Sequence, residues 1–161
     1  MRDQGWFDER GIAIPNLAEL LDLVALGTVA DVVPLDANNR ILTWQGMSRI
    51  RAGKCRPGIK ALLEVANRDP QKLAASDLGF ALGPRLNAAG RLDDMSVGVA
   101  LLLCDNIGEA RVLANELDAL NQTRKEIEQG MQVEALTLCE KLERSRDTLP
   151  GGLAMYHPEW H

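Results

Sequence analysis

The sequence has few cysteines and no long apolar segment. Its three cysteines, Cys55, Cys104 and Cys139, are widely spaced and odd in number, which fits free thiols better than a disulfide framework. The first ten residues contain no apolar stretch of the kind found in a leader peptide, and no apolar run is long enough to cross a bilayer. These absences argue against a disulfide-stapled secreted domain and a membrane-spanning one, and they predict a cytoplasmic protein without a membrane partner.

Positive charge is also scarce. The 18 lysines and arginines are outnumbered by 23 aspartates and glutamates, which gives a net charge of -5 at pH 7. Contacts to nucleic-acid phosphates normally depend on clustered lysine and arginine. The densest basic stretch, residues 49–56, has no aromatic side chain that could stack on a base, so a solvated surface is its simpler interpretation. Charge alone therefore does not indicate a polyanionic partner.

The composition is otherwise that of an ordinary globular protein, and its pattern is mainly helical. The 161 residues are 46% hydrophobic and 25% charged, enough for one domain with a core. Asn16 reads as a helix N-cap, apolar residues follow at helical spacing, and Gly27 reads as the stop of that helix. Asp36 starts a second helix, and residues 96–104 read as a buried core helix. The sequence predicts a mainly α stretch.

The longest regular element is predicted from about residue 109 to about residue 143. It carries a narrow apolar stripe with spacings of three, four or seven, and its other faces are highly charged. Such a helix would be roughly 50 Å long. It could be a coiled-coil arm or a spacer between two domains. Arg124 and Glu134 occupy seam positions and Gly130 weakens the interior, which argues against a strong dimer zipper.

Asp31 stands out within the apolar residues 21–35, where Asp22 is the only other acid. A carboxylate is costly to bury unless it is paired, hydrogen-bonded or bound to a metal. On pattern alone, the simpler interpretation is a local cap that accepts hydrogen bonds from nearby backbone N–H groups. The pattern leaves the metal-ligand interpretation open.

Residues 83–92, Gly-Pro-Arg-Leu-Asn-Ala-Ala-Gly-Arg-Leu, combine small residues with Arg85, Asn87 and Arg91. Small residues let the backbone approach a ligand closely, and arginine offers forked donors to phosphate oxygens. The alternative is tight helix packing, with both arginines paired to the two aspartates that follow. Spacing does not separate a phosphate-binding segment from a packing segment.

The C-terminal residues suggest the start of a sheet. Leu153–Tyr156 read as a first strand, although one strand without a partner is not stable. His157 and His161 are four residues apart, but Pro158 between them disrupts the helix that would place both on one face. Two surface histidines are therefore a simpler interpretation than a metal pair.

Three of these stretches together resemble motifs of the DHH phosphoesterase family. Residues 25–35, Ala-Leu-Gly-Thr-Val-Ala-Asp-Val-Val-Pro-Leu, resemble the family's fourth motif. Residues 83–92 and the terminal His-Pro-Glu-Trp-His resemble later motifs in the family's order. As a set they are most similar to the RecJ branch, exonucleases that degrade single-stranded DNA from its 5′ end. The upstream aspartate motifs and the Asp-His-His triplet are absent, so the chain resembles a central segment of a longer enzyme.

The resemblance implies a fragment of a two-domain α/β DHH phosphoesterase with a long connecting helix. Residues 1–104 would be the C-terminal part of the catalytic domain, residues 105–146 the connecting helix, and residues 147–161 the truncated start of the DHH-associated domain. The implied parent is a monomeric enzyme that hydrolyses phosphodiester bonds of single-stranded DNA with a metal ion, in repair and recombination. A polymer substrate needs a cleft between separated domains, which the long helix would provide.

The resemblance also implies roles for individual residues. Asp31 would be a ligand of Mn²⁺ or Mg²⁺, while Arg85, Asn87 and Arg91 would position the strand. His157 and His161 match a motif of the associated domain that binds phosphate. One carboxylate supplies only part of a coordination sphere, so the fragment is expected to be inactive alone.

Two other functions stay open at this stage. Small-substrate members of the family cleave short oligonucleotides, cyclic dinucleotides or pyrophosphate, and the Asp31 motif alone does not exclude them. The chain could also be a non-catalytic helical module whose long amphipathic helix docks a partner.

Overall fold

The computed structural model describes residues 5–92, 94–145, 151–158 and 160. Seven α-helices follow one another: α1 (Leu21–Ala30), α2 (Ala37–Arg51), α3 (Pro57–Val65), α4 (Ala75–Asp77), α5 (Gly83–Leu92), α6 (Ser96–Leu103) and α7 (Ile107–Ser145). Short 3₁₀ turns lie at η2 (Asp8–Arg10), η3 (Leu17–Leu20) and η4 (Pro70–Lys72), and η5 (Leu78–Leu82) is π-helical. The described residues contain no strand, which confirms the prediction of a mainly α chain.

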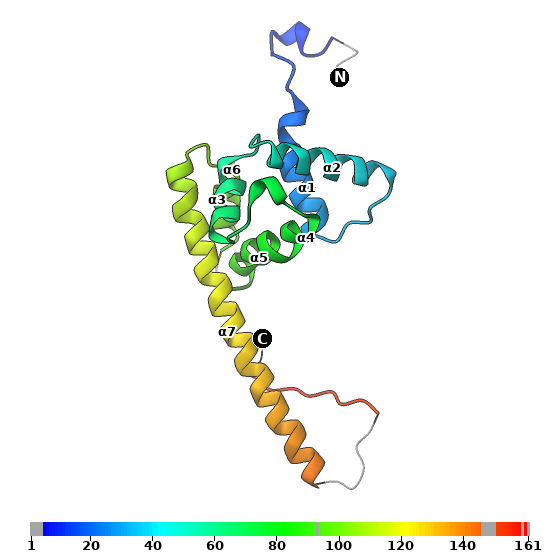
Figure 1. The fold of residues 1–161 in the computed structure, drawn as a ribbon, viewed down its shortest axis with the longest axis vertical. Coiled ribbons are helices and arrows are strands. Elements are labelled where there is room, and N and C mark those ends of the chain that lie inside the picture. Colours follow the sequence, from blue (N-terminus) through cyan, green and yellow to red (C-terminus); the bar gives the residue numbers. More distant parts are fainter. Residues whose placement is uncertain (1–4, 93, 146–150, 159, 161) are drawn as a thin grey trace.

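Helices α1 to α6 form a cluster against the first half of α7, and the second half of α7 extends beyond it (Figure 1). At 39 residues, α7 is about 58 Å long at 1.5 Å per residue. Only its first half contributes to the core, through Ala110, Ala114 and Leu117. The larger core side chains come from the other helices: Ile50, Ile59, Leu62, Leu63, Leu78, Leu82 and Leu101. No described helix has both the length and the apolar character to span a membrane.

An exposed ion pair also ties α7 to the cluster. Arg111 Nε donates to Glu64 Oε2 at 2.7 Å, and its Nη2 donates to Oε1 at 3.2 Å. These bonds from Arg111 lower the pKa of the Glu64 carboxyl. Because the folded-state pKa is below the unfolded one, the pair stabilises the fold above the ordinary carboxyl pKa and loses this effect as the pH falls through the lowered pKa.

Asp22 is the buried acid of this segment, whereas Asp31 is exposed, so it is the carboxylate of Asp22 that needs hydrogen-bond partners in the interior. Asp22 is 1% exposed. Its Oδ2 accepts a hydrogen bond from the backbone N–H of Arg56, the N-cap of α3, at 2.8 Å, and its Oδ1 accepts one from the N–H of Leu23 at 2.8 Å. The carboxylate therefore lies at the positive end of α3 and joins α1 to that helix.

Replacing Asp22 with alanine is expected to lower the free energy of unfolding by about 1–3 kcal/mol, because the buried N–H of Arg56 loses its acceptor. Asparagine keeps one acceptor oxygen and should cost less than alanine. Urea denaturation of the wild type and both variants measures this order. An alanine variant as stable as the wild type would show that the buried carboxylate contributes no net stability.

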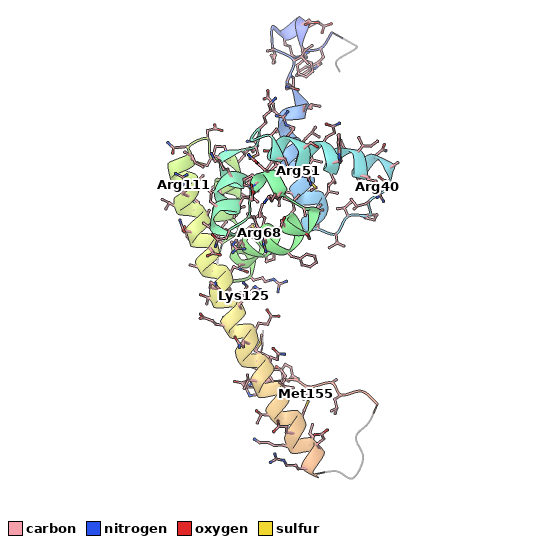
Figure 2. The ribbon with its side chains drawn as sticks, viewed as in Figure 1. Arg40, Arg51, Arg68, Arg111, Lys125 and Met155 are labelled. Atoms are coloured by element: carbon pink, nitrogen blue, oxygen red, sulfur yellow. The ribbon has the colours of Figure 1, made fainter. Side chains whose placement is uncertain are left out.

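Three local predictions were wrong. Helix α1 continues through Gly27 to Ala30, because a turn after Asp31, and not the glycine, ends it. Helix α6 is not a buried core helix: it buries Gly98 and Leu101, while one side remains in contact with solvent. Leu153–Tyr156 form no strand, since no partner strand exists among the described residues. This segment instead runs beside the second half of α7, where Met155 lies (Figure 2).

Candidate metal and strand-binding site

Asp31 lies at the C-terminal end of α1, exposed to solvent. Its N–H donates to the carbonyl of Gly27 at 3.0 Å, and the N–H of Val33 donates to the carbonyl of Thr28 at 3.0 Å. The second of these is the six-to-one bond of a Schellman turn, which reverses the chain just past Asp31. The carboxylate has no hydrogen bond or ion pair to another described residue, so its oxygens are available to a ligand.

The turn after Asp31 is strained. Val32 has φ of 54° and is 85% exposed. A β-branched residue in this left-handed region is a true outlier, at a cost of about 1–2 kcal/mol relative to ordinary backbone. Retained strain of this kind is concentrated at functional sites. Its position next to Asp31 supports a functional role for this end of α1.

Val32→Gly is expected to raise the free energy of unfolding by about 0.5–1 kcal/mol, because relief of strain outweighs the added entropy of glycine in the unfolded chain. Val33→Gly is the matched control. It lies one residue on, outside the left-handed region, and should lower stability. Thermal unfolding of both variants tests the pair, and a lower melting temperature for Val32→Gly would contradict the assignment of strain.

The π-helical turn η5 precedes α5 and directs its start toward the end of α1, where Asp31 lies. Pro84 has no N–H to donate to the carbonyl of residue 80, and its ring crowds that carbonyl. The N–H of Gly83 donates instead to the carbonyl of Leu78, five residues earlier, which widens the turn. The start of α5 then packs on the end of α1, where a Cβ on Gly83 would lie 3.2 Å from Cβ of Ala30. Packing at Gly83 therefore brings α5 beside Asp31.

Asp31 and Asn87 line one hollow of about 310 Å³. It lies between the end of α1, α5 and α6, and the rest of its lining is mostly apolar: Leu23, Leu26, Leu86, Met95, Val99 and Leu102 among others. Carboxylate and amide oxygens are ligands that suit hard divalent cations. The fold therefore places two oxygen-bearing side chains from separate motifs at the same hollow.

The three predicted strand-binding residues of α5 do not lie together. Arg85 turns toward α7, where its Nε donates to Asp118 Oδ1 at 2.7 Å, and its Nη1 donates to the Ala81 carbonyl at 2.7 Å. Asn87 and Arg91 are four residues apart, share the other face of α5 and are exposed. The alternative interpretation, in which both arginines pair with the two following aspartates, therefore does not hold for Arg85.

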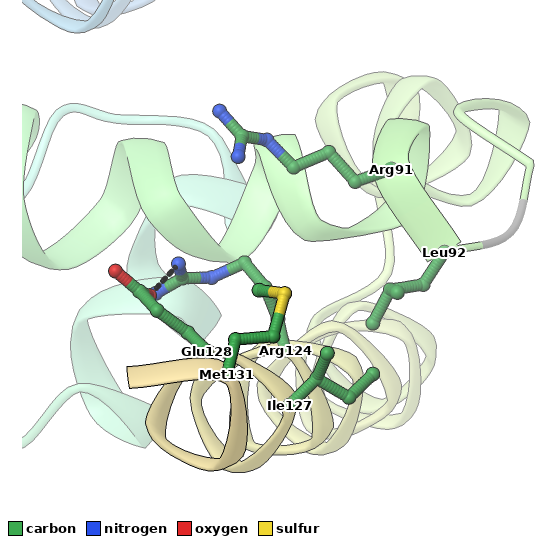
Figure 3. A pocket seen from close by; sticks show the side chains of 6 residues that line it. All are labelled: Arg91, Leu92, Arg124, Ile127, Glu128 and Met131. Carbon is green, nitrogen blue, oxygen red and sulfur yellow. Dashed lines mark hydrogen bonds and ion pairs between the residues drawn. The ribbon is translucent and has the colours of Figure 1, made fainter. Parts of the chain in front are cut away.

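Arg91 lines a second hollow, of about 390 Å³, between the end of α5 and α7 (Figure 3). On the α7 side, Nη1 of Arg124 donates to Oε2 of Glu128 at 2.6 Å. Ile127 and Met131 of α7 and Leu92 of α5 complete the lining. Arg124 was not among the predicted site residues. Its sequence signal was a charge on the apolar stripe of the long helix, which had been interpreted only as an argument against dimerisation.

Of the two C-terminal histidines, only His157 is described by the structure, and it does not line the hollow at Asp31. His157 lies against the second half of α7, next to Val133, Leu138 and Lys141, with its ring centroid 5.8 Å from that of Trp160. His161 lies outside the described residues. Their predicted phosphate-binding role stays a prediction.

The described residues would complete only part of a metal site. They contain no group of three or more histidine, cysteine, aspartate or glutamate side chains that could hold an ion. Asp31 fits as one oxygen ligand because it is exposed and without a partner, and Asn87 lines the same hollow. The donor chemistry therefore suits Mn²⁺ or Mg²⁺ at one coordination position.

The chain matches no model of a known protein family. It is, however, 98% identical over all 161 residues to the single-stranded-DNA-specific exonuclease RecJ of Escherichia coli K12, of which it spans 28%. A crystal structure of exonuclease RecJ bound to manganese matches with a TM-score of 0.70 and 36% identity, over 82% of this chain and 33% of that one. RecJ from Thermus thermophilus in complex with Mg²⁺ matches with a TM-score of 0.68 and 36% identity, over 80% of this chain and 20% of that one.

The match to RecJ of Escherichia coli spans the whole chain and therefore includes the end of α1, the segment around α5 and the long helix. Identity across the full chain agrees with the three motifs recognised in the sequence, and the structural likeness agrees with the helical arrangement. The chain is therefore similar over its whole length to one helical stretch of RecJ, a protein of the DHH family, and it spans 28% of the length of the relative from Escherichia coli.

Proposed function

We propose that the full-length protein containing this chain is a metal-dependent exonuclease that degrades single-stranded DNA from the 5′ end, in DNA repair and recombination. The relatives are named as exonucleases specific for single-stranded DNA, and structural neighbours are described with Mg²⁺ or Mn²⁺. The observation that carries the proposal is the exposed carboxylate of Asp31, which has no hydrogen bond or ion pair among the described residues and lines one hollow with Asn87.

A bound Mn²⁺ or Mg²⁺ would polarise the scissile phosphate and lower the pKa of an attacking water. Asp31 would hold this ion through one carboxylate oxygen. The amide of Asn87, at the same hollow, positions the strand beside that carboxylate. The guanidinium of Arg91, on the same face of α5, binds a phosphate oxygen with forked donors.

Arg85 fits direct strand binding less well, because its guanidinium is engaged with Asp118 and the Ala81 carbonyl. Its contribution to strand binding is then indirect: it holds α5 against α7 and so keeps Asn87 and Arg91 in place. His157 and His161 would bind phosphate from the associated domain, as their motif implies. Helix α7, which leaves the cluster and extends beyond it, suits a connection between two domains across a cleft (Figure 1).

The partner of this protein would be single-stranded DNA, and the enzyme would act as a monomer. The apolar stripe of α7 is interrupted by Arg124, Glu134 and Gly130, which weakens the case for a paired coiled coil. A nuclease of this kind works where the chromosome is, so a cytoplasmic location in a bacterium follows from the proposed activity.

The test is hydrolysis of a 5′-labelled single-stranded oligonucleotide by the full-length protein with Mn²⁺. Mononucleotides should be released from the 5′ end, an otherwise identical duplex should resist, and a chelator should stop the reaction. The 161-residue chain by itself should be inactive. If the full-length protein cleaves only cyclic dinucleotides or short oligonucleotides, the small-substrate alternative replaces this proposal.

A further inference from the structure

We propose that Arg124 of α7, together with Arg91 of α5, binds a phosphodiester group of the DNA strand at the hollow between these two helices. This inference rests on the proposed function, because the ligand is the backbone of the same single strand. It adds a residue of the long helix to a binding surface otherwise assigned to α5.

The two arginines come from elements that are distant in sequence but in contact in the fold. Arg91 lies at the end of α5, and Arg124 lies on α7 just past the buried Leu117 and Asn121. Both line the same hollow of about 390 Å³, Arg91 from the α5 side and Arg124 from the α7 side (Figure 3). A hollow of this volume is within the range of small-ligand sites, which is enough for one nucleotide.

The hydrogen bonds of Arg124 leave a donor unused. Its Nη1 donates to Glu128 at 2.6 Å, yet its Nε is buried and has no acceptor among the described residues. The side chain is only 25% exposed. An ordinary surface pair of residues four apart on a helix would leave this N–H in water. Leaving a buried N–H of a charged group without an acceptor costs free energy. An oxygen of a bound ligand would accept this hydrogen bond and remove the cost.

The charges around the hollow favour an anion. Its lining includes two guanidinium groups and one carboxylate, so the local charge is positive in a chain whose net charge is -5. A phosphate that displaces Glu128 from Arg124 gains forked, charge-assisted hydrogen bonds. Glu128 would then compete with the phosphate for Arg124. While no strand is bound, its carboxylate balances the charge of the Arg124 guanidinium.

The remaining lining suits the rest of a nucleotide. Leu92, Ile127 and Met131 supply the apolar part of the lining (Figure 3). A sugar or base face can pack on such a surface without sequence preference, and methionine adapts to different shapes. A free inorganic anion would use the arginines alone, whereas a nucleotide would use both parts of the hollow.

The experiment measures binding of a fluorescent single-stranded oligonucleotide to the full-length protein, with Asp31→Asn present throughout to prevent hydrolysis. Fluorescence anisotropy is recorded over a range of salt concentrations. Arg124→Gln should weaken binding by roughly 5–10-fold and reduce the salt dependence by the contribution of about one phosphate contact. Arg124→Lys should retain most of the salt dependence, and Glu128→Gln should tighten binding by roughly 2–5-fold because the competitor is removed.

Arg111→Gln is the matched control. It removes the same charge from the same helix, but Arg111 is paired with Glu64 away from this hollow. Its binding and salt dependence should remain within about twofold of the parent. Thermal unfolding of each variant establishes that the fold is retained.

Each result bears on the inference. Equal losses for Arg124→Gln and Arg111→Gln would mean that only net charge matters, and unchanged binding for Arg124→Gln would mean that no contact exists; either overturns it. Failure of the proposed function would be seen separately, as absence of single-stranded DNA hydrolysis by the protein with Asp31 intact. Hydrolysis by that protein, combined with normal binding by Arg124→Gln, would reject this subsite alone.

Discussion

Asp31→Asn in the full-length protein is expected to reduce hydrolysis of single-stranded DNA by about 1,000-fold, a loss of several kcal/mol of transition-state stabilisation. Asparagine has nearly the same shape but carries no charge, so it weakens the hold on a divalent cation. The fold should be unaffected, because the Asp31 carboxylate contacts no other described residue through a hydrogen bond or ion pair and is exposed. Initial rates across a range of Mn²⁺ concentrations measure the effect.

Asp36→Asn provides the matched control. Asp36 is also exposed, lies five residues from Asp31, and caps α2 by accepting a hydrogen bond from the N–H of Asn39 at 2.8 Å. Asparagine caps a helix about as well as aspartate. This variant should therefore retain wild-type activity and stability. An Asp31→Asn enzyme that is as active as Asp36→Asn at low Mn²⁺ would rule out the assignment of Asp31 as a metal ligand.

Gly46→Ala is expected to lower the free energy of unfolding by about 3 kcal/mol, because it inserts a methyl group where α1 and α2 cross. A Cβ at Gly46 would overlap the Leu21 carbonyl oxygen and lie 2.6 Å from Cβ of Ala25. The obstacle is backbone, which cannot move aside as a flexible side chain can. The two helices would have to separate.

Gly130→Ala is the opposite case within the same chain. Gly130 lies inside α7, and nothing is within 4 Å of the position that its Cβ would take. Alanine should therefore stabilise the helix by about 0.5–1 kcal/mol. Urea denaturation of the two variants should give changes of opposite sign. A Gly46→Ala protein as stable as the wild type would show that the α1–α2 crossing is looser than the structure has it.

Local sequence signals predicted helix starts better than helix ends. Asn16 and Asp36 cap the elements that follow them, because a side-chain acceptor satisfies nearby N–H groups wherever the helix is packed. Gly27 was interpreted as a helix end, but α1 continues for three residues because packing against α2 and η5 supports them. Whether a helix ends at a glycine depends on tertiary packing, which a local sequence pattern does not include.

Burial was less predictable than periodicity. Of the large apolar residues of α2, Met47 and Ile50 are buried, whereas Ile41 and Trp44 are 60% and 59% exposed. The buried face instead includes Thr43 and Gly46, since the close crossing with α1 needs small side chains. Hydrophobicity alone does not show which face of a helix has a neighbour.

The sequence by itself determined the helical class, the long helix, and the family through three ordered motifs, because these depend on residue types and spacings along the chain. Only the tertiary structure decided which residues share a site. It buried Asp22 and exposed Asp31, and it paired Arg85 with Asp118. It also placed Asn87 and Asp31 at one hollow and Arg124 and Arg91 at another. These outcomes depend on how helices distant in sequence pack, and that packing follows from the shape of the whole core.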